Sequence, residues 1–133
     1  MRRVLDHPDQ VEWHQDWQRW VPAPAALRFD PDLSTFVERL LAKQQQGASD
    51  VASLGGSDDK AAAVYVIDVR EVEELEYTVE HSPDDETPIN HAHCSILAVA
   101  EDSKSQKKER RRRLAALLRH AYGEITVAVP DNA

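Results

Sequence analysis

The chain has 133 residues, 41% of them hydrophobic and 30% charged, which is typical of a single globular domain over residues 1–133. Its net charge of −8 excludes nucleic-acid binding by the surface as a whole, although a local basic patch could still bind phosphate. The single cysteine excludes an internal disulfide, and no apolar run approaches the roughly 20 residues that span a bilayer, so we expect a cytoplasmic protein without membrane contact.

Two helices are predicted in the first third of the chain. Pro8 is tolerated in a first helical turn, and Trp13, Trp17 and Trp20 recur with the spacing of one helical face. We therefore expect a helix over residues 8–20 whose tryptophans pack mainly into the core, with Trp13 the most exposed of them. The helical spacing of five further apolar residues predicts a second helix, and these are Leu33, Phe36, Val37, Leu40 and Leu41.

The middle of the chain reads as a loop, a strand and a short helix. Residues 47–60 are rich in Gly, Ser, Ala and Asp, which predicts a flexible surface loop. The β-branched and aromatic run at residues 62–67 predicts a buried strand. Asp68 and Glu71 have the spacing of a capping box, so a short helix to about residue 75 is expected.

The remaining elements complete an α+β pattern. Residues 77–81 alternate and predict a strand, and residues 92–99 are apolar on both faces, which suits a central strand. A final helix is predicted over residues 105–122, with a last strand over residues 125–129. The order of these elements indicates an α+β fold, in which helices cover a small three- or four-stranded sheet mainly on one face.

Two neighbouring stretches carry opposite charge. Residues 68–86 hold nine acidic residues and one basic residue, a net charge of −8. Residues 102–113 hold seven basic and two acidic residues, a net charge of +5. The helical positions three, four and seven before the apolar Leu114 are all cationic, namely Arg111, Arg110 and Lys107.

Three interpretations of the basic stretch stay open. Its cations are solvated beyond the core, or they pair with the chain's own acidic stretch, or they bind nucleic-acid phosphates or an acidic protein surface. The residues that would contact such a partner or phosphate are Lys107, Lys108, Arg110, Arg111, Arg112 and Arg113.

His91 and His93 are candidate site residues, because histidines two apart on a strand point to the same face. With a carboxylate such as Asp85 from the preceding loop, they would hold a divalent metal. Without a metal they would act as an acid–base pair, and His81 on the neighbouring predicted strand is a further candidate. Purely structural roles for these histidines stay open, and Cys94 is expected to be buried.

Three short segments carry a resemblance. They are a Trp-x-Arg-x-Val-Pro start at residues 17–22, residues 33–36, and a Pro-x-x-His-Ala-His segment at residues 88–93. Together with the Lys/Arg-rich helix that follows, they resemble segments of a group of small bacterial proteins, over most of the chain. The resemblance implies no catalytic residue, and it favours an accessory role beside a larger protein.

The segregated charges favour a non-enzymatic interaction module, an accessory subunit or regulator that docks on a larger bacterial protein and needs no cofactor. One alternative is a metal-dependent hydrolase or nuclease that uses His91 and His93 with a nearby carboxylate. Another alternative is nucleic-acid binding through the basic helix.

Overall fold

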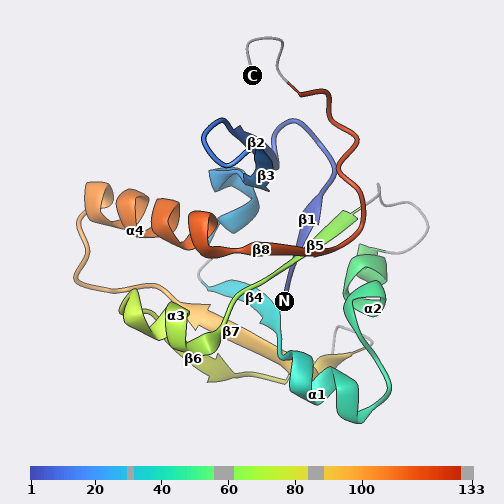
Figure 1. The fold of residues 1–133 in the computed structure, drawn as a ribbon. Helices are drawn as coiled ribbons and strands as arrows, with labels where there is room; N and C mark the ends of the chain where they lie inside the picture. The colour runs from blue at the N-terminus through green and yellow to red at the C-terminus, as the bar shows by residue number, and fades with distance from the viewer. Residues whose placement is uncertain (30–31, 56–61, 84–88, 130–133) are drawn as a thin grey trace.

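Helices and strands are mixed in the computed structural model, which describes residues 1–29, 32–55, 62–83 and 89–129. The described strands form three small antiparallel sheets, where the sequence predicted one sheet of three or four strands. Figure 1 shows the strands in the middle of the molecule and helices on either side of them. The α+β class is therefore confirmed, and the single sheet is not.

The first sheet is built around β5 (Ala62–Val66), which lies between β1 (Arg2–Leu5) and β8 (Arg119–Tyr122). Its central place agrees with the buried strand predicted from an apolar, β-branched run, and its middle residues are fully buried. Val64 and Tyr65 are neighbours on β5 and point to opposite faces, so this strand packs against the core on both sides.

The second sheet has the order β4 (Leu33–Phe36), β7 (His93–Leu97), β6 (Thr78–His81). The predicted strands at residues 77–81 and 92–99 are confirmed as β6 and β7. The predicted helix from Leu33 is wrong over its first turn, because β4 pairs with β7 and directs Leu33 and Thr35 inward. A strand partner supplied by the rest of the chain outweighs the helical spacing there.

The third sheet is a hairpin of β2 (Val11–His14) and β3 (Arg19–Pro22), so the helix predicted over residues 8–20 is wrong. Trp13 and Trp20 lie directly opposite each other on the two strands, with their rings edge to face at 5.4 Å. Cross-strand aromatic pairs of this kind stabilise hairpins, and tryptophan itself favours strands.

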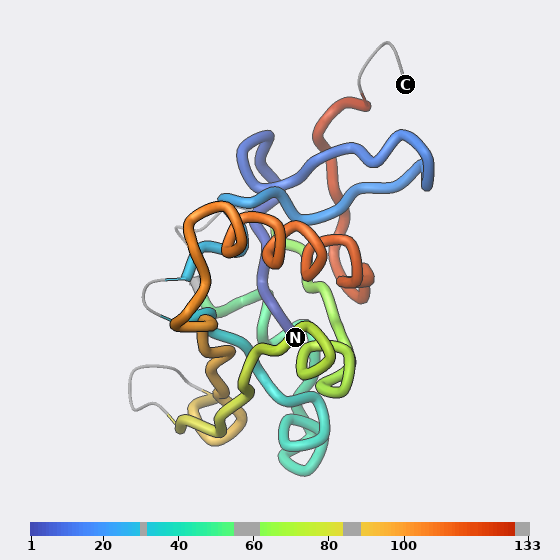
Figure 2. Tube along the Cα trace, turned by 90° about the vertical axis from the view of Figure 1, so that its left-hand side faces the viewer, coloured from blue at the N-terminus to red at the C-terminus, as the bar shows by residue number. Residues whose placement is uncertain are grey.

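The third tryptophan lies in the hairpin loop. Trp17 is 49% exposed, whereas Trp13 and Trp20 are half-buried, so the expectation that Trp13 would be the most exposed is also wrong. The Trp17 ring stacks on His14 at 3.8 Å between centroids, and the guanidinium of Arg19 lies 4.8 Å from the ring centroid. These contacts hold an exposed aromatic ring in the loop of the hairpin. Figure 2 shows the path of this hairpin, in blue, away from the rest of the chain.

Most of the helices are short. The structure contains α1 (Glu38–Lys43), α2 (Ala48–Ala52), α3 (Val69–Glu74) and α4 (Lys104–Leu117), together with the 3-10 turns η1 (Pro24–Leu27), η2 (Ser53–Gly55) and η3 (Asn90–Ala92). The short helix predicted after Asp68 is confirmed as α3. The flexible loop predicted over residues 47–60 instead contains α2 and η2, and residues 56–61 lie outside the described part. No helix in the described ranges is long and apolar enough to cross a membrane.

The C-terminal elements differ from the prediction in their bounds. The helix predicted over residues 105–122 ends at Leu117, because Leu118 turns to an extended conformation with φ −66° and ψ 134°. The next residues pair with β5 as β8, so the predicted strand at residues 125–129 is not a strand. Residues 119–122 are the first to follow α4, and they pair with the edge of β5 that β1 leaves free. The apolar residues at 125–129 therefore find no free edge on β5.

The largest core lies between the first two sheets and α4. It contains Tyr65 from β5, Ile96 from β7 and Leu114 from α4. A smaller core joins α1 and α2 to the other face of β5 through Leu41, Val51 and Val64, with further members in Phe36, Ile89 and Ala92. Full burial of each such side chain stabilises the fold by roughly 1.5–3 kcal/mol, so these two clusters hold the sheets together.

Gly123, directly after β8, offers a test of this arrangement. It has φ +83°, and a Cβ added there would lie 2.4 Å from the carbonyl oxygen of Ala62. Gly123→Ala is therefore expected to lower the free energy of unfolding by more than about 1 kcal/mol in urea denaturation. Gly47→Ser, which adds a Cβ where no atom lies within 4 Å, is the control and should change it by less than about 0.5 kcal/mol.

Candidate functional site

The basic helix α4 begins at a capping box that the sequence prediction missed. Ser103 Oγ accepts a hydrogen bond from the Gln106 amide at 3.3 Å, and Gln106 Oε1 accepts one from the Ser103 amide at 2.8 Å. Leu114 and Leu118 are buried beneath the other end of the helix. The cationic first half therefore extends beyond the core, which is one of the three interpretations that the sequence left open.

Arg110 ties this helix to the chain's acidic stretch. Its guanidinium donates to both carboxylate oxygens of Asp102 at 2.7 Å, to the Leu75 carbonyl at 2.5 Å, and to Glu76 at 3.2 Å. The hydrogen bond from Arg110 lowers the pKa of Asp102, and the same contact raises the pKa of Arg110. Arg110 thus serves the fold and is not available to a partner.

Two further arginines pair within α4 itself. Glu109 accepts from Arg112 at 3.3 Å and lies 3.5 Å from Arg113, one helical turn away in each case. All three side chains are at least half exposed, so these ion pairs are weak in water. One carboxylate shared by two arginines leaves this side of the helix with a net positive charge.

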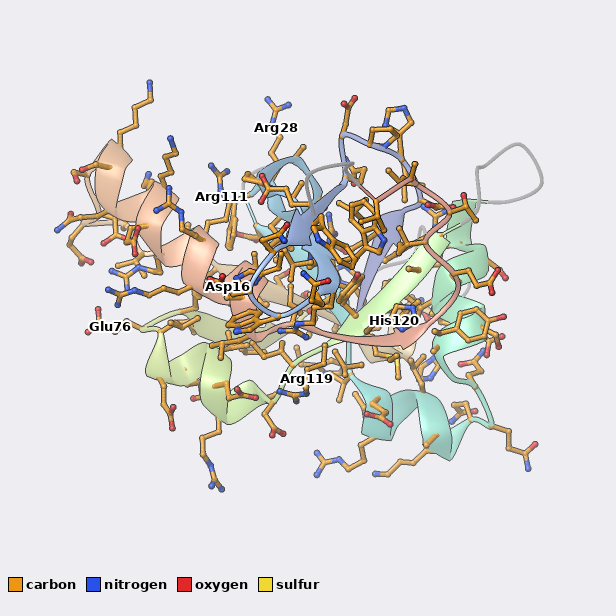
Figure 3. The ribbon with its side chains drawn as sticks, turned by 45° about the horizontal axis from the view of Figure 1, so that its top comes forward. Asp16, Arg28, Glu76, Arg111, Arg119 and His120 are labelled. Atoms are coloured by element: carbon orange, nitrogen blue, oxygen red, sulfur yellow. The ribbon has the colours of Figure 1, made fainter. Side chains whose placement is uncertain are left out.

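Four cations of α4 have no carboxylate at ion-pair distance among the described residues. Lys104, Lys107, Lys108 and Arg111 follow one another at i, i+3, i+4 and i+7, which places them along one side of α4. We call these four residues the basic face. The three lysines are exposed and Arg111 is half-buried. Arg28, exposed just after η1, extends from the element that packs beside α4 (Figure 3).

A second polar cluster occupies the outer face of the β4-β7-β6 sheet. Ser34, Ser95 and Glu80 are direct partners across the three strands, so they share one face, and His93 lies on that face two residues before Ser95. Ser34 Oγ lies 2.6 Å from His93 Nε2, and His93 Nδ1 lies 2.7 Å from the Ser82 carbonyl. The sequence prediction missed Ser34 because it assigned this segment to a helix.

The predicted metal ligands are not brought together in the described residues. His91 lies in η3 and His93 begins β7, so they are not two residues of one strand, and the argument that they share a strand face is wrong. The third predicted ligand, Asp85, lies outside the described part. His81 Nε2 donates to the His91 carbonyl at 2.8 Å. No group of three or more His, Cys, Asp or Glu side chains suited to a metal occurs among the described residues.

The inner face of the same sheet borders a cavity of about 700 Å³. Its lining is mainly apolar and includes Leu33, Ile96 and Val72, while Glu38 and Asp68 contribute charge. Cys94 is buried on this side, as predicted, and its Sγ lies 2.9 Å from Thr35 Oγ1. The cavity thus lies on the opposite face of the sheet from Ser34 and His93.

The tie between Arg110 and Asp102 gives a testable pH dependence. Because folding lowers the pKa of Asp102, the pair stabilises the fold above the ordinary value of 3.8 and loses this effect as the pH falls through the folded-state pKa. Asp102→Asn should therefore lower the free energy of unfolding at pH 7, and the difference from the wild type should shrink at pH 3. Glu73→Gln, an exposed change of equal charge on α3, is the control in the same urea titrations, and an equal loss in both variants would contradict a specific role for Asp102.

No protein-family model, curated protein or solved structure matches this chain.

Proposed function

We propose that this chain is an interaction module that docks on an acidic surface of a larger protein through the basic face of α4. The observation that carries this proposal is the set of four cations, spaced i, i+3, i+4 and i+7 along one side of the helix, with no carboxylate at ion-pair distance among the described residues. Neighbouring Arg110, Arg112 and Arg113 do have such partners within the chain.

The stability of α4 does not account for the basic face. No acidic residue lies in the first helical turn, where a carboxylate would interact favourably with the helix dipole, and Lys104 stands there instead. Each cation near this end costs a few tenths to about 1 kcal/mol. A negatively charged partner surface would offset that cost.

A protein partner fits the surroundings of α4 better than a nucleic acid does. Glu71, Glu73, Glu74 and Glu76 belong to α3 or directly follow it, and Arg110 joins this acidic segment to α4. A phosphate backbone would be repelled by these carboxylates, whereas a protein surface of mixed charge can complement both patches. The net charge of −8 adds to the repulsion of a long polyanion.

The basic face can be tested by charge reversal. The triple variant Lys107→Glu, Lys108→Glu, Arg111→Glu is expected to weaken binding of the partner by about tenfold or more, because attraction becomes repulsion. The partner is captured by affinity from nuclease-treated lysate of the native host, and the lysines of this chain are cross-linked to it. The binding affinity is then measured by titration with the identified partner. The matched control reverses Arg39, Lys43 and Arg70, which lie on α1 and α3 and give the same change in net charge.

The proposal predicts a partner that the wild type and the control capture and that the triple variant does not. In the wild type, the cross-links should join Lys107 or Lys108 to an acidic segment of that partner. Equal capture by all three proteins would contradict it. Binding of a DNA or RNA duplex, with a log–log salt slope of about −0.9 per phosphate contact, would replace the protein partner by a nucleic acid.

A metal-dependent hydrolase is a second candidate, and one observation favours it. The Nε2 atom of His91 is buried and has no hydrogen-bond partner in the described part of the chain, which is unusual for an imidazole nitrogen inside a protein. His93 is less suited to a metal, because both of its ring nitrogens already have partners in the chain.

Elemental analysis tests this candidate. If His91 Nε2 binds a divalent metal, the gently purified wild type should contain zinc, manganese or nickel in a constant ratio, and His91→Ala should lose it. His81→Ala is the control, since His81 Nε2 is used in a hydrogen bond to the His91 carbonyl. Metal-free wild-type protein, or equal metal content in both variants, would remove this candidate.

A further inference from the structure

The polar face of the β4-β7-β6 sheet contains a serine and a histidine in hydrogen-bond contact. Ser34 Oγ and His93 Nε2 are 2.6 Å apart, which is a short hydrogen bond. Ser34 is exposed, while His93 is only 9% exposed. The pair therefore joins an exposed residue to a nearly buried one, and its hydrogen bond is partly buried.

The other ring nitrogen fixes the tautomer of His93. Nδ1 lies 2.7 Å from the carbonyl oxygen of Ser82, and a carbonyl can only accept a hydrogen bond. In the neutral imidazole Nδ1 therefore carries the proton and Nε2 carries the lone pair. It follows that the Ser34 hydroxyl donates its proton to Nε2, which is how a general base activates a serine.

The orientation of the imidazole is determined by several further contacts. The Ser82 hydroxyl lies 3.1 Å from Nδ1 and 2.8 Å from the hydroxyl of Ser95, and the ring of Phe36 packs edge to face on the imidazole at 5.4 Å. The Ser82 amide also donates to the His93 carbonyl at 3.1 Å. His93 is thus positioned by β7, by the end of β6 and by an aromatic ring.

A guanidinium lies next to the backbone of the serine. Arg2 donates to the Ser34 carbonyl at 2.8 Å, and its other contacts are to the Ala26 carbonyl at 3.1 and 2.9 Å. No carboxylate lies at ion-pair distance from Arg2 among the described residues, so its positive charge is not neutralised locally. These bonds hold the backbone of β4 at the residue that carries the hydroxyl.

From these contacts we propose that Ser34 and His93 form a catalytic pair for acyl transfer, with a carboxylic ester as the substrate class. Ser34 Oγ attacks the ester carbonyl carbon while its proton passes to His93 Nε2. The bond to the alcohol oxygen then breaks, and the alcohol leaves with that proton. Water next attacks the acyl-serine, gives a proton to His93, and releases the acid as Ser34 regains its hydrogen.

This proposal stands apart from docking through α4, since none of its residues belongs to the basic face. If it holds, the expectation of a non-enzymatic module would be replaced by that of an esterase. The two proposals also fail separately, because charge reversal on α4 leaves Ser34 and His93 in place.

The test combines a serine-directed probe with a simple ester. The full chain is treated with a fluorophosphonate, the modified residue is mapped by mass spectrometry, and release of p-nitrophenolate from p-nitrophenyl acetate is followed in parallel. We expect the fluorophosphonate label on Ser34 of the wild type. Both labelling and ester turnover should fall by about 100-fold or more in Ser34→Ala and in His93→Gln. Ser49→Ala is the control, because Ser49 is an exposed serine on α2, outside the β4-β7-β6 sheet, and it should keep both activities.

Circular dichroism and thermal unfolding establish that each variant is folded. Ser34→Ala removes only an exposed hydroxyl, so it carries the comparison if His93→Gln does not fold. Absence of label on Ser34 in the folded wild type would overturn the proposal. So would labelling or turnover that is unchanged in His93→Gln, since the hydroxyl would then not depend on the base.

Discussion

The register between β4 and β7 is the constraint on which both faces of the second sheet depend. Leu33 lies opposite Ile96, and Ser34 lies opposite Ser95. A shift by one residue would turn Ser34 toward the core and Leu33 toward solvent, because side chains on a strand alternate between faces. Burial of Leu33 and Ile96, each 3% exposed or less, therefore fixes the register that brings Ser34 to His93. The polar cluster is positioned by the apolar residues behind it.

The buried and the cationic residues of α4 lie on the same side of the helix, with Leu114 and Leu118 toward its end and the basic face toward its beginning, and Arg110 anchors the helix close to where the two meet. Arg110 makes hydrogen bonds to Asp102 and to the end of α3, and below it Leu114 is fully buried. Of the three cations that precede Leu114 on its side of the helix, Lys107, Arg110 and Arg111, only Arg110 pairs with acidic residues of the chain. The hydrogen bonds of Arg110 hold α4 in place, and they therefore also fix the position of the backbone that carries Lys107 and Lys108.

Local signals allowed some elements to be predicted from the sequence, and pairing between distant segments determined the others. A β-branched run is sufficient to predict β5. The helix α3 follows Asp68 as predicted, although the Asp68 side chain makes no capping hydrogen bond. In residues 8–20 the tryptophan spacing fits a helix, but Trp13 and Trp20 also fit opposite positions of a hairpin, and only the fold decides between them. The cations of α4 could be named in advance. Which of them are neutralised could not, because Glu76 lies 34 residues from Arg110.

Exposure is what distinguishes the Ser34–His93 pair from an ordinary structural hydrogen bond. A structural link across a sheet contributes about 1 kcal/mol, and it gains from exclusion of water around both groups. Here the acceptor is nearly buried while the donor remains exposed, so the bond gains little from a low-dielectric environment. The Ser82 carbonyl meanwhile prepares Nε2 to accept a proton. The fixed tautomer of His93 beside an exposed serine is therefore the feature on which the proposed acyl transfer depends.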